Sequence, residues 1–233
     1  MTTPKAALLA LCMVLLTIAS DAGAGQVTIA GPFGSFNVEA KSRNEMRWDH
    51  VVRQQYDYSC GAAAVATLLT YHYGRETTEA EVFEFMIEHG DREQIQTQGF
   101  SMLDMKRYLD SQGLDSDGFK LKLDDYLKIG APAITLINTG GYKHFVVIKG
   151  MDEDSVLVGD PAVGSVVVPR KHFETLWQGT VLGARAEMQV AQHYFNHERD
   201  WKILPPSPLS QGMRRAGLGT SLLLLPGPNE LGR

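Results

Sequence analysis

The sequence predicts an α+β fold in which several helices come first and an antiparallel sheet follows. Between residues 60 and 130, apolar residues recur at the spacing of helices. From 132 to 187, short runs rich in β-branched residues are separated by turn residues. Helices and strands that occupy different parts of a chain are typical of α+β folds, whereas alternating strands and helices would predict a parallel sheet.

The first predicted helix forms the centre of the fold. Residues 60–73, CGAAAVATLLTYHY, are small or apolar nearly all round, and Gly74 follows as a stop signal. A helix that is apolar on every side is buried in the middle of a core. We therefore expect this helix to pack against the C-terminal sheet.

Capping and turn signals predict the other elements. Thr78 and Glu81 form a capping box that opens a second helix, which ends at Gly90. Further helices are expected at 101–112, with Ser101 as the N-cap, at 124–129 and at 170–177. Strands are expected at 132–138, 143–149, 155–159, 165–168 and 180–187.

The N-terminus has the parts of a secretory signal peptide. Residues 1–24 combine the basic residue Lys5, an apolar stretch at 6–19 and the small residues 22–24 at the cleavage position. A signal peptide predicts export to the periplasm, and its cleavage would remove Cys12 from the mature chain.

Composition divides the rest of the chain into three parts. Residues 25–45 are polar and predict an extended segment with a short edge strand around Val27. The periodic signals fall within residues 46–190, which predict the folded domain. Residues 191–233 form a C-terminal extension. From 205 onward it holds five of the ten prolines and five glycines in 29 residues, so it is expected to be poorly ordered.

Charge and composition exclude several classes of protein. The chain has 22 basic and 27 acidic side chains and a formal net charge of −5, which argues against a nucleic-acid-binding protein. No apolar run reaches the roughly 18 residues that span a bilayer, so no transmembrane anchor is expected after signal cleavage. Two cysteines are too few for a disulfide-rich scaffold or a cysteine-only metal site. With Cys12 removed, Cys60 is the single cysteine and cannot form an internal disulfide.

No metal or cofactor is expected. His193 and His197 have the i, i+4 spacing of a metal pair, but the residues between them lack the glutamate that zinc proteases use as a base. Core or solvated histidines are the simpler interpretation.

Three residues suggest nucleophilic catalysis. Cys60 stands at the predicted first turn of the buried helix, where backbone N–H groups and the helix dipole stabilise a thiolate. Such a nucleophile also needs a histidine and a group that orients it. The predicted strands 143–149 and 155–159 are joined by a short loop and form a hairpin. A turn centred on Asp152 would place His144 directly opposite Asp160. Cross-strand Cβ atoms lie about 5 Å apart, which suits a histidine–aspartate hydrogen bond.

Four segments together resemble one enzyme family. They are residues 54–63 (QQYDYSCGAA), 71–74 (YHYG), 141–147 (GYKHFVV) and 159–161 (GDP). In this combination they are similar to the papain-like bacteriocin-processing peptidases, which cut secretion leaders after a double glycine. The resemblance covers about residues 46–186 and implies a papain-like cysteine peptidase fold, with N-terminal helices packed on a C-terminal antiparallel sheet.

The resemblance also implies a role for each matching residue. Cys60 would be the nucleophile, His144 the general acid/base and Asp160 its orienting partner. Gln54 would donate its amide to the oxyanion hole beside the Cys60 backbone N–H. Gln55 is the rival for that role.

Two departures from the usual form of the family bear on the substrate. The residue before the cysteine is often acidic in the family, whereas here it is Ser59, which leaves the substrate preference open. Many members are the cytoplasmic front domain of an export transporter, whereas this chain carries a signal peptide. In that respect it is similar to the stand-alone proteases of bacterial functional-amyloid export systems.

The resulting hypothesis is a periplasmic cysteine endopeptidase without a cofactor. Its partner would be a polypeptide, either an exported protein or a component of a secretion system, and the cleavage site stays open. The alternative is a non-catalytic peptidase-like module that binds or chaperones an exported client.

Overall fold

The computed structural model describes residues 26–31, 34–39 and 41–203, and the chain divides after Glu45 into two compact units. In the first unit, β1 (Gln26–Gly31) and β2 (Gly34–Glu39) pair as an antiparallel two-stranded sheet. The strand expected around Val27 is therefore paired with its own hairpin partner. The predicted signal peptide and the segment from 205 onward lie outside the described residues.

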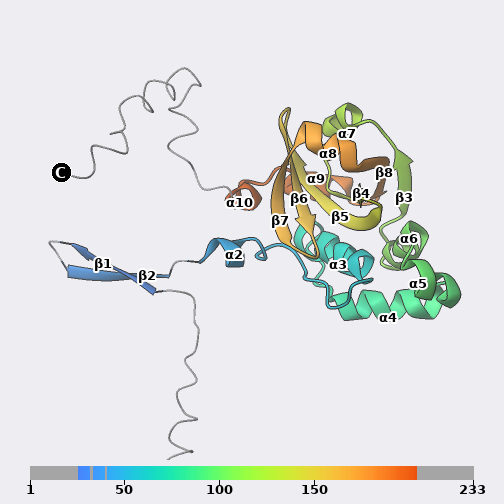
Figure 1. The fold of residues 1–233 in the computed structure, drawn as a ribbon, viewed down its shortest axis with the longest axis horizontal. Coiled ribbons are helices and arrows are strands. Elements are labelled where there is room, and N and C mark those ends of the chain that lie inside the picture. The colour runs from blue at the N-terminus through green and yellow to red at the C-terminus, as the bar shows by residue number, and fades with distance from the viewer. Residues whose placement is uncertain (1–25, 32–33, 40, 204–233) are drawn as a thin grey trace, which may run out of the picture. The chain divides into compact units, whose positions relative to one another are not determined.

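The second unit combines helices with a six-stranded antiparallel sheet. After the short α2 (Arg43–Met46), its helices are α3 (Cys60–His72), α4 (Glu79–His89), α5 (Arg92–Gln98), α6 (Met102–Ser111), α7 (Leu123–Ile129), α8 (Arg170–Leu176), α9 (Met188–Tyr194) and α10 (Glu198–Trp201). Its strands are β3 (Ser116–Lys120), β4 (Ala133–Thr139), β5 (Tyr142–Met151), β6 (Ser155–Asp160), β7 (Gly164–Pro169) and β8 (Trp177–Ala184). Their order in the sheet is β3-β8-β4-β5-β6-β7, with every neighbouring pair antiparallel (Figure 1). The predicted α+β class is confirmed.

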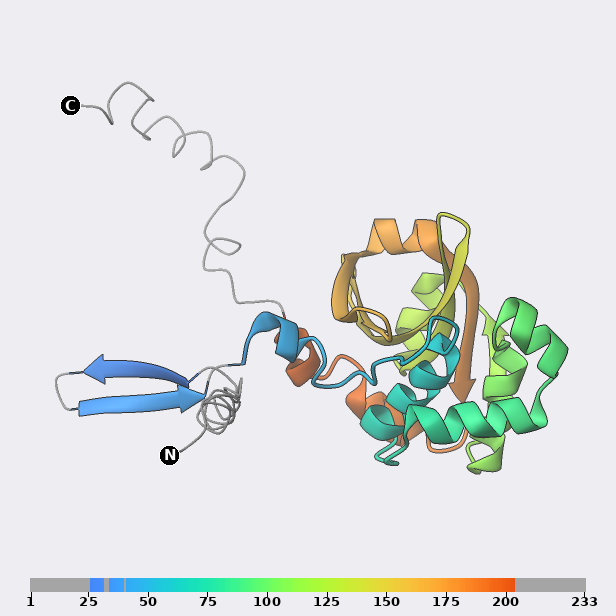
Figure 2. The ribbon, with the colours of Figure 1, turned by 60° about the horizontal axis from the view of Figure 1, so that its bottom comes forward.

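Helix α3 is the central helix that its composition predicts. It packs against β5 on one side and against α4 and α6 on the other (Figure 2). The small side chains Ala62, Ala63 and Ala64 are completely buried. Because they are small, the neighbouring elements can approach the helix closely from several directions.

Strand β5 is buried on both faces. Phe145 and Val147 belong to the core under α3, whereas Val146 and Ile148 belong to a second core covered by α7 and α8. A strand that is covered on both sides needs apolar residues at successive positions, which explains its continuous apolar run.

The predicted helix ends agree with the structure. Thr78 and Glu81 form the capping box of α4, and Ser101 caps α6 by accepting from the Asp104 N–H. At the end of α7, Gly130 adopts the left-handed conformation with φ of 59°, which glycine reaches without a steric penalty.

The register of the β5–β6 hairpin differs from the prediction. A turn centred on Asp152 would pair Val147 with Leu157, whereas the structure pairs it with Gly159. The turn is tighter and lies later in the chain, because the Asp152 N–H donates to the Ser155 carbonyl at 2.9 Å and Asp152 Oδ1 accepts from the Ser155 N–H at 2.6 Å. A bulge between Ile148 and Gly150 then shifts the register again. Since the net shift is an even number of residues, each side chain keeps its face of the sheet.

Some elements are absent from the sequence-based prediction. These are α2, α5, β3, α9 and α10, together with the hairpin partner β2. Each short helix buries little: Ile95 is the buried residue of α5 and Ala191 that of α9. A single buried position creates no apolar period, so periodicity could not reveal them.

Candidate active site

Cys60 begins α3 beside a large cavity. Its side chain is buried, and it lines a cavity of about 970 Å³. Ser59, directly before it, is completely buried. The Ser59 hydroxyl donates to the Tyr56 carbonyl at 2.9 Å and accepts from the Tyr56 N–H at 3.1 Å. The side chain of Ser59 thus closes the preceding turn and does not cap the helix. The first backbone N–H groups of α3 therefore have no side-chain cap and remain donors beside Cys60.

His144 and Asp160 are brought together as expected, although by a different register. The His144 Nε2 atom lies 2.8 Å from Asp160 Oδ1. Continuing the observed pairing puts Asp160 opposite Val146, so His144 is its diagonal neighbour on the same face of the sheet. Diagonal side chains are still within reach of each other when one of them is long. The Asp160 carboxylate is held by the N–H of Ala162, at 2.7 Å from Oδ1.

The second ring nitrogen of His144 is left for Cys60. Nδ1 is buried and makes no hydrogen bond of ordinary geometry with the described residues. Burial alone would lower the pKa of His144, but the hydrogen bond to Asp160 and the neighbouring Cys60 side chain raise it to about 9. At neutral pH the ring is therefore an imidazolium, which is the partner that stabilises a thiolate.

Gln54 and Gln55 occupy different environments. Gln54 is half-buried, and its backbone N–H donates to the Pro161 carbonyl at 3.0 Å, which ties it to the residue after Asp160. Its side-chain Nε2 donates to the Tyr56 carbonyl at 3.0 Å. Gln55 is exposed, and its backbone N–H donates to the Glu79 carboxylate at 2.9 Å. The Pro161 carbonyl and the Glu79 carboxylate thus anchor two successive residues of the loop before Cys60.

Tyr142 is a site residue that sequence reasoning missed. Its ring stacks on that of His144 with 5.9 Å between centroids, and its hydroxyl donates to the Asp57 carbonyl at 3.1 Å. Burial, followed by the charges of Cys60 and Asp57, raises the pKa of Tyr142, so the hydroxyl remains a donor. The available signal was its position two residues before His144, on the same face of the strand.

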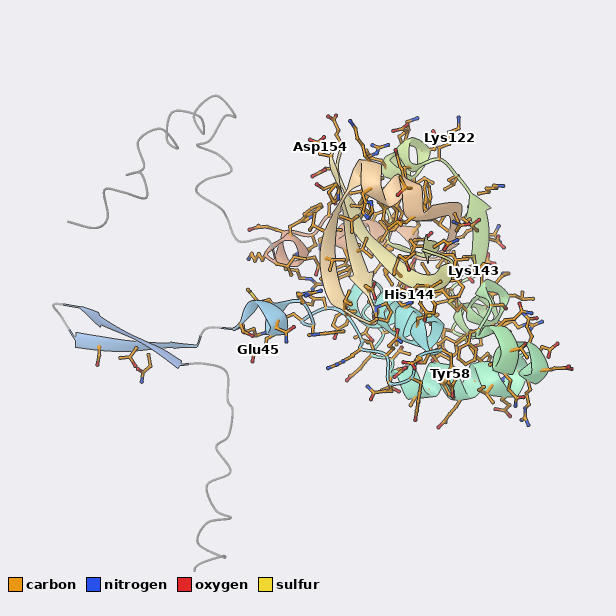
Figure 3. All side chains as sticks on the ribbon, in the orientation of Figure 1. Glu45, Tyr58, Lys122, Lys143, His144 and Asp154 are labelled. Atoms are coloured by element: carbon orange, nitrogen blue, oxygen red, sulfur yellow. The ribbon has the colours of Figure 1, made fainter. Side chains whose placement is uncertain are left out.

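The cavity beside Cys60 has the volume to hold a short chain segment. It is lined by Asp57, Tyr58, Cys60, Gly61, Phe83, Ile87, Gln94, Ile95, Gln96, Thr97, Gln98, Gly99, Phe100, Ser101, Met102, Leu136, Tyr142, Lys143, Phe145, Gln178 and Thr180. Of these described lining residues, only Asp57 and Lys143 carry a charge. Figure 3 shows Lys143 and His144 toward the end of the sheet near α3 and Tyr58, well away from the hairpin turn at Asp154.

The described part of the chain offers no metal site. Across residues 26–31, 34–39 and 41–203, no group of three or more His, Cys, Asp or Glu side chains could hold an ion. His193 and His197 have ring centroids 6.3 Å apart, and His197 Nδ1 accepts from the Arg199 N–H at the start of α10. In the same residues, no helix has the length and apolar character needed to cross a membrane.

Known proteins show similarity over the same region. The model of the peptidase C39 family matches residues 48–188, which is more than half of the chain. A protein of Pseudomonas fluorescens named probable functional amyloid protease FapD is 37% identical over 203 residues, covering 86% of each chain. Its namesake from Pseudomonas aeruginosa is 39% identical over 173 residues, covering 74% of this chain and 73% of the other.

A solved structure shares the fold. The peptidase domain of Streptococcus ComA, a bifunctional ABC transporter, superposes with a TM-score of 0.50 at 22% identity. The match covers 57% of this chain and 96% of that domain. The helices around α3 and the antiparallel sheet therefore form the papain-like arrangement of these peptidase domains. With the family model matched across residues 48–188 and two relatives above 30% identity, this chain belongs to the peptidase C39 family of cysteine peptidases.

Proposed function

We propose that this chain is a periplasmic cysteine endopeptidase that processes an exported protein or a secretion-system component. The single observation that carries the proposal is the 2.8 Å contact of His144 with Asp160, with the other ring nitrogen left for Cys60 beside a 970 Å³ cavity. A thiol, an imidazolium and an orienting carboxylate are the groups that peptide-bond cleavage by a cysteine requires.

The chemistry follows from the positions of these groups. The Cys60 thiolate attacks the peptide carbonyl carbon, a C–S bond forms, and the carbonyl electron pair becomes an oxyanion. The Cys60 backbone N–H and the second amide hydrogen of Gln54 hold that oxyanion. His144 gives its proton to the leaving nitrogen as the C–N bond breaks. Water then attacks the thioester, His144 accepts a proton from it, and the thiolate returns.

Two further observations support the place of action and the class of substrate. The N-terminal 24 residues have the parts of a signal peptide, and two relatives are named as probable functional amyloid proteases. An exported enzyme meets exported polypeptides, so a client of a functional-amyloid export system is the substrate that both observations favour.

Mass spectrometry of exported proteins tests the proposal. Cells that produce the wild-type chain should yield a truncated client, and cells with Cys60→Ala or Cys60→Ser should yield the full-length client. Both variants should also lose labelling by iodoacetamide, because Cys60 is the cysteine of the mature chain. Undiminished processing by either variant contradicts the proposal. A client that is bound at unchanged mass by the wild type would instead support the non-catalytic binding module.

A further inference from the structure

A buried ionic cluster lies behind the candidate active site. The Lys149 ammonium on β5 donates to Asp200 at 3.0 Å and to the Ser165 hydroxyl at 3.1 Å, and the side chains of both charged residues are completely buried. His50 Nδ1 lies 2.9 Å from the same Asp200 oxygen. Nothing in the proposed chemistry uses these groups, and buried charges are costly unless they are paired.

Lys149 supports both strands of the turn that presents Asp160. A Cβ atom added at Gly159 would lie 2.9 Å from Lys149 Cδ, so the aliphatic stem packs directly against the residue before Asp160. On the neighbouring strand, Ser165 is the cross-strand partner of Gly159, and it accepts from the Lys149 ammonium. The stem and the head of one lysine thus hold the two sides of the β6–β7 turn.

That turn positions two of the proposed catalytic groups. Asp160 lies at its start and contacts His144, and the Pro161 carbonyl accepts from the Gln54 N–H at 3.0 Å. We infer that Lys149, neutralised by Asp200, is a positioning residue for Asp160 and for Gln54. The inference rests on the proposed function.

Asp200 is the counter-charge that keeps the lysine in place. Burial alone would raise the pKa of Asp200, but the hydrogen bond from His50 and the charge of Lys149 lower it to about 2, so the carboxylate is ionised. The neighbouring His72 is buried, and burial together with the charge of Lys149 lowers its pKa to about 3, so it stays neutral. An ammonium that lost Asp200 would move toward water and withdraw its stem from Gly159.

The counter-charge comes from outside the region that matches the family. The family model ends at residue 188, whereas Asp200 lies on α10. Asn196 anchors the segment between residue 188 and Asp200 to the sheet. Its side-chain oxygen accepts from the Met151 N–H at 2.7 Å, and its side-chain nitrogen donates to the Met151 carbonyl at 2.8 Å. Residues 189–203 are therefore part of the machinery that positions the site.

Four variants test the inference. Asp200→Asn keeps the shape and removes the counter-charge. Lys149→Met keeps most of the stem and removes the ammonium, and Lys149→Ala removes both. The double variant Lys149→Met/Asp200→Asn removes both charges and keeps the stem. Asp115→Asn is the matched control, because it removes one of the two acidic partners of Arg185 in an exposed ion-pair network.

The readouts are kcat and the pKa of His144, the latter followed by NMR titration of the histidine ring. Asp200→Asn should lower kcat about 10- to 100-fold with little change in KM, because a shift of about 1 Å in a catalytic group costs rate rather than binding. It should also lower the pKa of His144, because Asp160 holds the ring less firmly. Lys149→Ala should lower kcat and the pKa of His144 in the same way. Lys149→Met/Asp200→Asn should recover most of the wild-type kcat and His144 pKa, and Asp115→Asn should change neither value.

If Asp200→Asn leaves both kcat and the pKa of His144 unchanged, the inference is overturned. A lowered melting temperature alone would show only that the Lys149–Asp200 pair stabilises the fold. If Asp200→Asn does not fold, Lys149→Met/Asp200→Asn is compared with Lys149→Ala/Asp200→Asn. Equal kcat and equal His144 pKa in these two would then overturn it. A wild-type chain that cleaves no client contradicts the proposed function instead, while the NMR titration still decides the positioning role.

Discussion

The proposed site depends on the protonation of His144, and two neighbouring residues favour its protonated form. Asp160 accepts a hydrogen bond from one ring nitrogen, and both Asp160 and Cys60 raise the pKa of the ring. The pKa of about 9 means that the protonated ring persists across the neutral range. The protonated ring is therefore available to pair with the Cys60 sulfur and to give a proton to the leaving group.

The pH dependence follows from the direction of this shift. The pKa of His144 in the folded chain lies above its ordinary value of 6.5. Its contribution to stability is therefore fully present below about pH 6.5 and is lost as the pH rises through about 9. We expect kcat/KM to fall above about pH 9 as the imidazolium loses its proton. In Asp160→Asn the alkaline limb should move to lower pH, and a pH–rate profile of both chains measures it. A limb that stays at the same pH contradicts the assignment.

The two glutamines before the cysteine should differ in effect. Gln54 is half-buried and tied to the residue after Asp160, whereas Gln55 is exposed. Loss of one oxyanion donor typically costs about 100-fold or more in kcat. We expect that loss for Gln54→Ala and little change for Gln55→Ala, measured as kcat at saturating peptide. The reverse order would assign the role to Gln55.

The environment of Ser59 could not be predicted from the sequence. The family often has an acidic residue before the cysteine, and the departure to Ser59 left the substrate preference open. In the structure it is completely buried and bonded to the Tyr56 backbone. The direction of a side chain in an irregular loop depends on contacts that no local pattern encodes, so its structural role became visible only in three dimensions.

At the level of elements, α4 holds the loop that carries Gln54. Glu79, in the first turn of α4, is buried, and its two carboxylate oxygens lie 2.9 and 3.1 Å from the Gln55 N–H. A carboxylate at a helix N-terminus is also favoured by the helix dipole. The loop is thus fixed by α4 on one side and by the β6–β7 turn on the other.

Removal of this anchor should reduce both stability and rate. Glu79→Ala deletes a hydrogen bond to a charged group, which typically costs about 1.5–3 kcal/mol. We expect a lower melting temperature, and a kcat lowered about tenfold because the Gln54 amide is less well placed. Glu84→Ala, on the same helix at a more accessible position, is the control and should change neither. A full kcat in Glu79→Ala would show that the anchor does not position the loop.

The sequence could predict those elements whose signals are local. The apolar composition of α3, the capping box of α4 and the Ser101 N-cap of α6 depend on neighbouring residues alone, and each appears where expected. The predicted hairpin register is wrong because the turn closes at Asp152 and Ser155 and because β5 carries a bulge, and an alternating pattern reveals neither feature. His144 still meets Asp160 because an even shift preserves the face of the sheet.

At the scale of the whole molecule, the cavity brings together the helical part of the sequence and the later strands. Helices α3, α4, α5 and α6 and strands β4, β5 and β8 all contribute to its lining. Asp57 lies three residues before Cys60, and Lys143 lies next to His144 on β5. Apart from these two residues and the Cys60 thiol, the described lining side chains are apolar, hydroxyl or amide. The charged residues of the protein are thus nearly excluded from the surface that a peptide would contact.

This composition predicts the charge preference of the proposed peptidase. A charged substrate side chain that enters the cavity loses water and finds no opposite charge on the uncharged walls, which disfavours it. We expect a client peptide with a single Glu or Lys placed along the bound segment to be cut about tenfold more slowly than its Gln counterpart, as judged by kcat/KM. A peptide scanned position by position, with Gln as the reference at each, measures the effect, and positions outside the bound segment act as internal controls. Because Asp57 and Lys143 have opposite signs, Glu and Lys should differ from each other only at the positions next to the scissile bond. Equal rates for charged and uncharged peptides at every position would mean that the substrate does not run through this cavity.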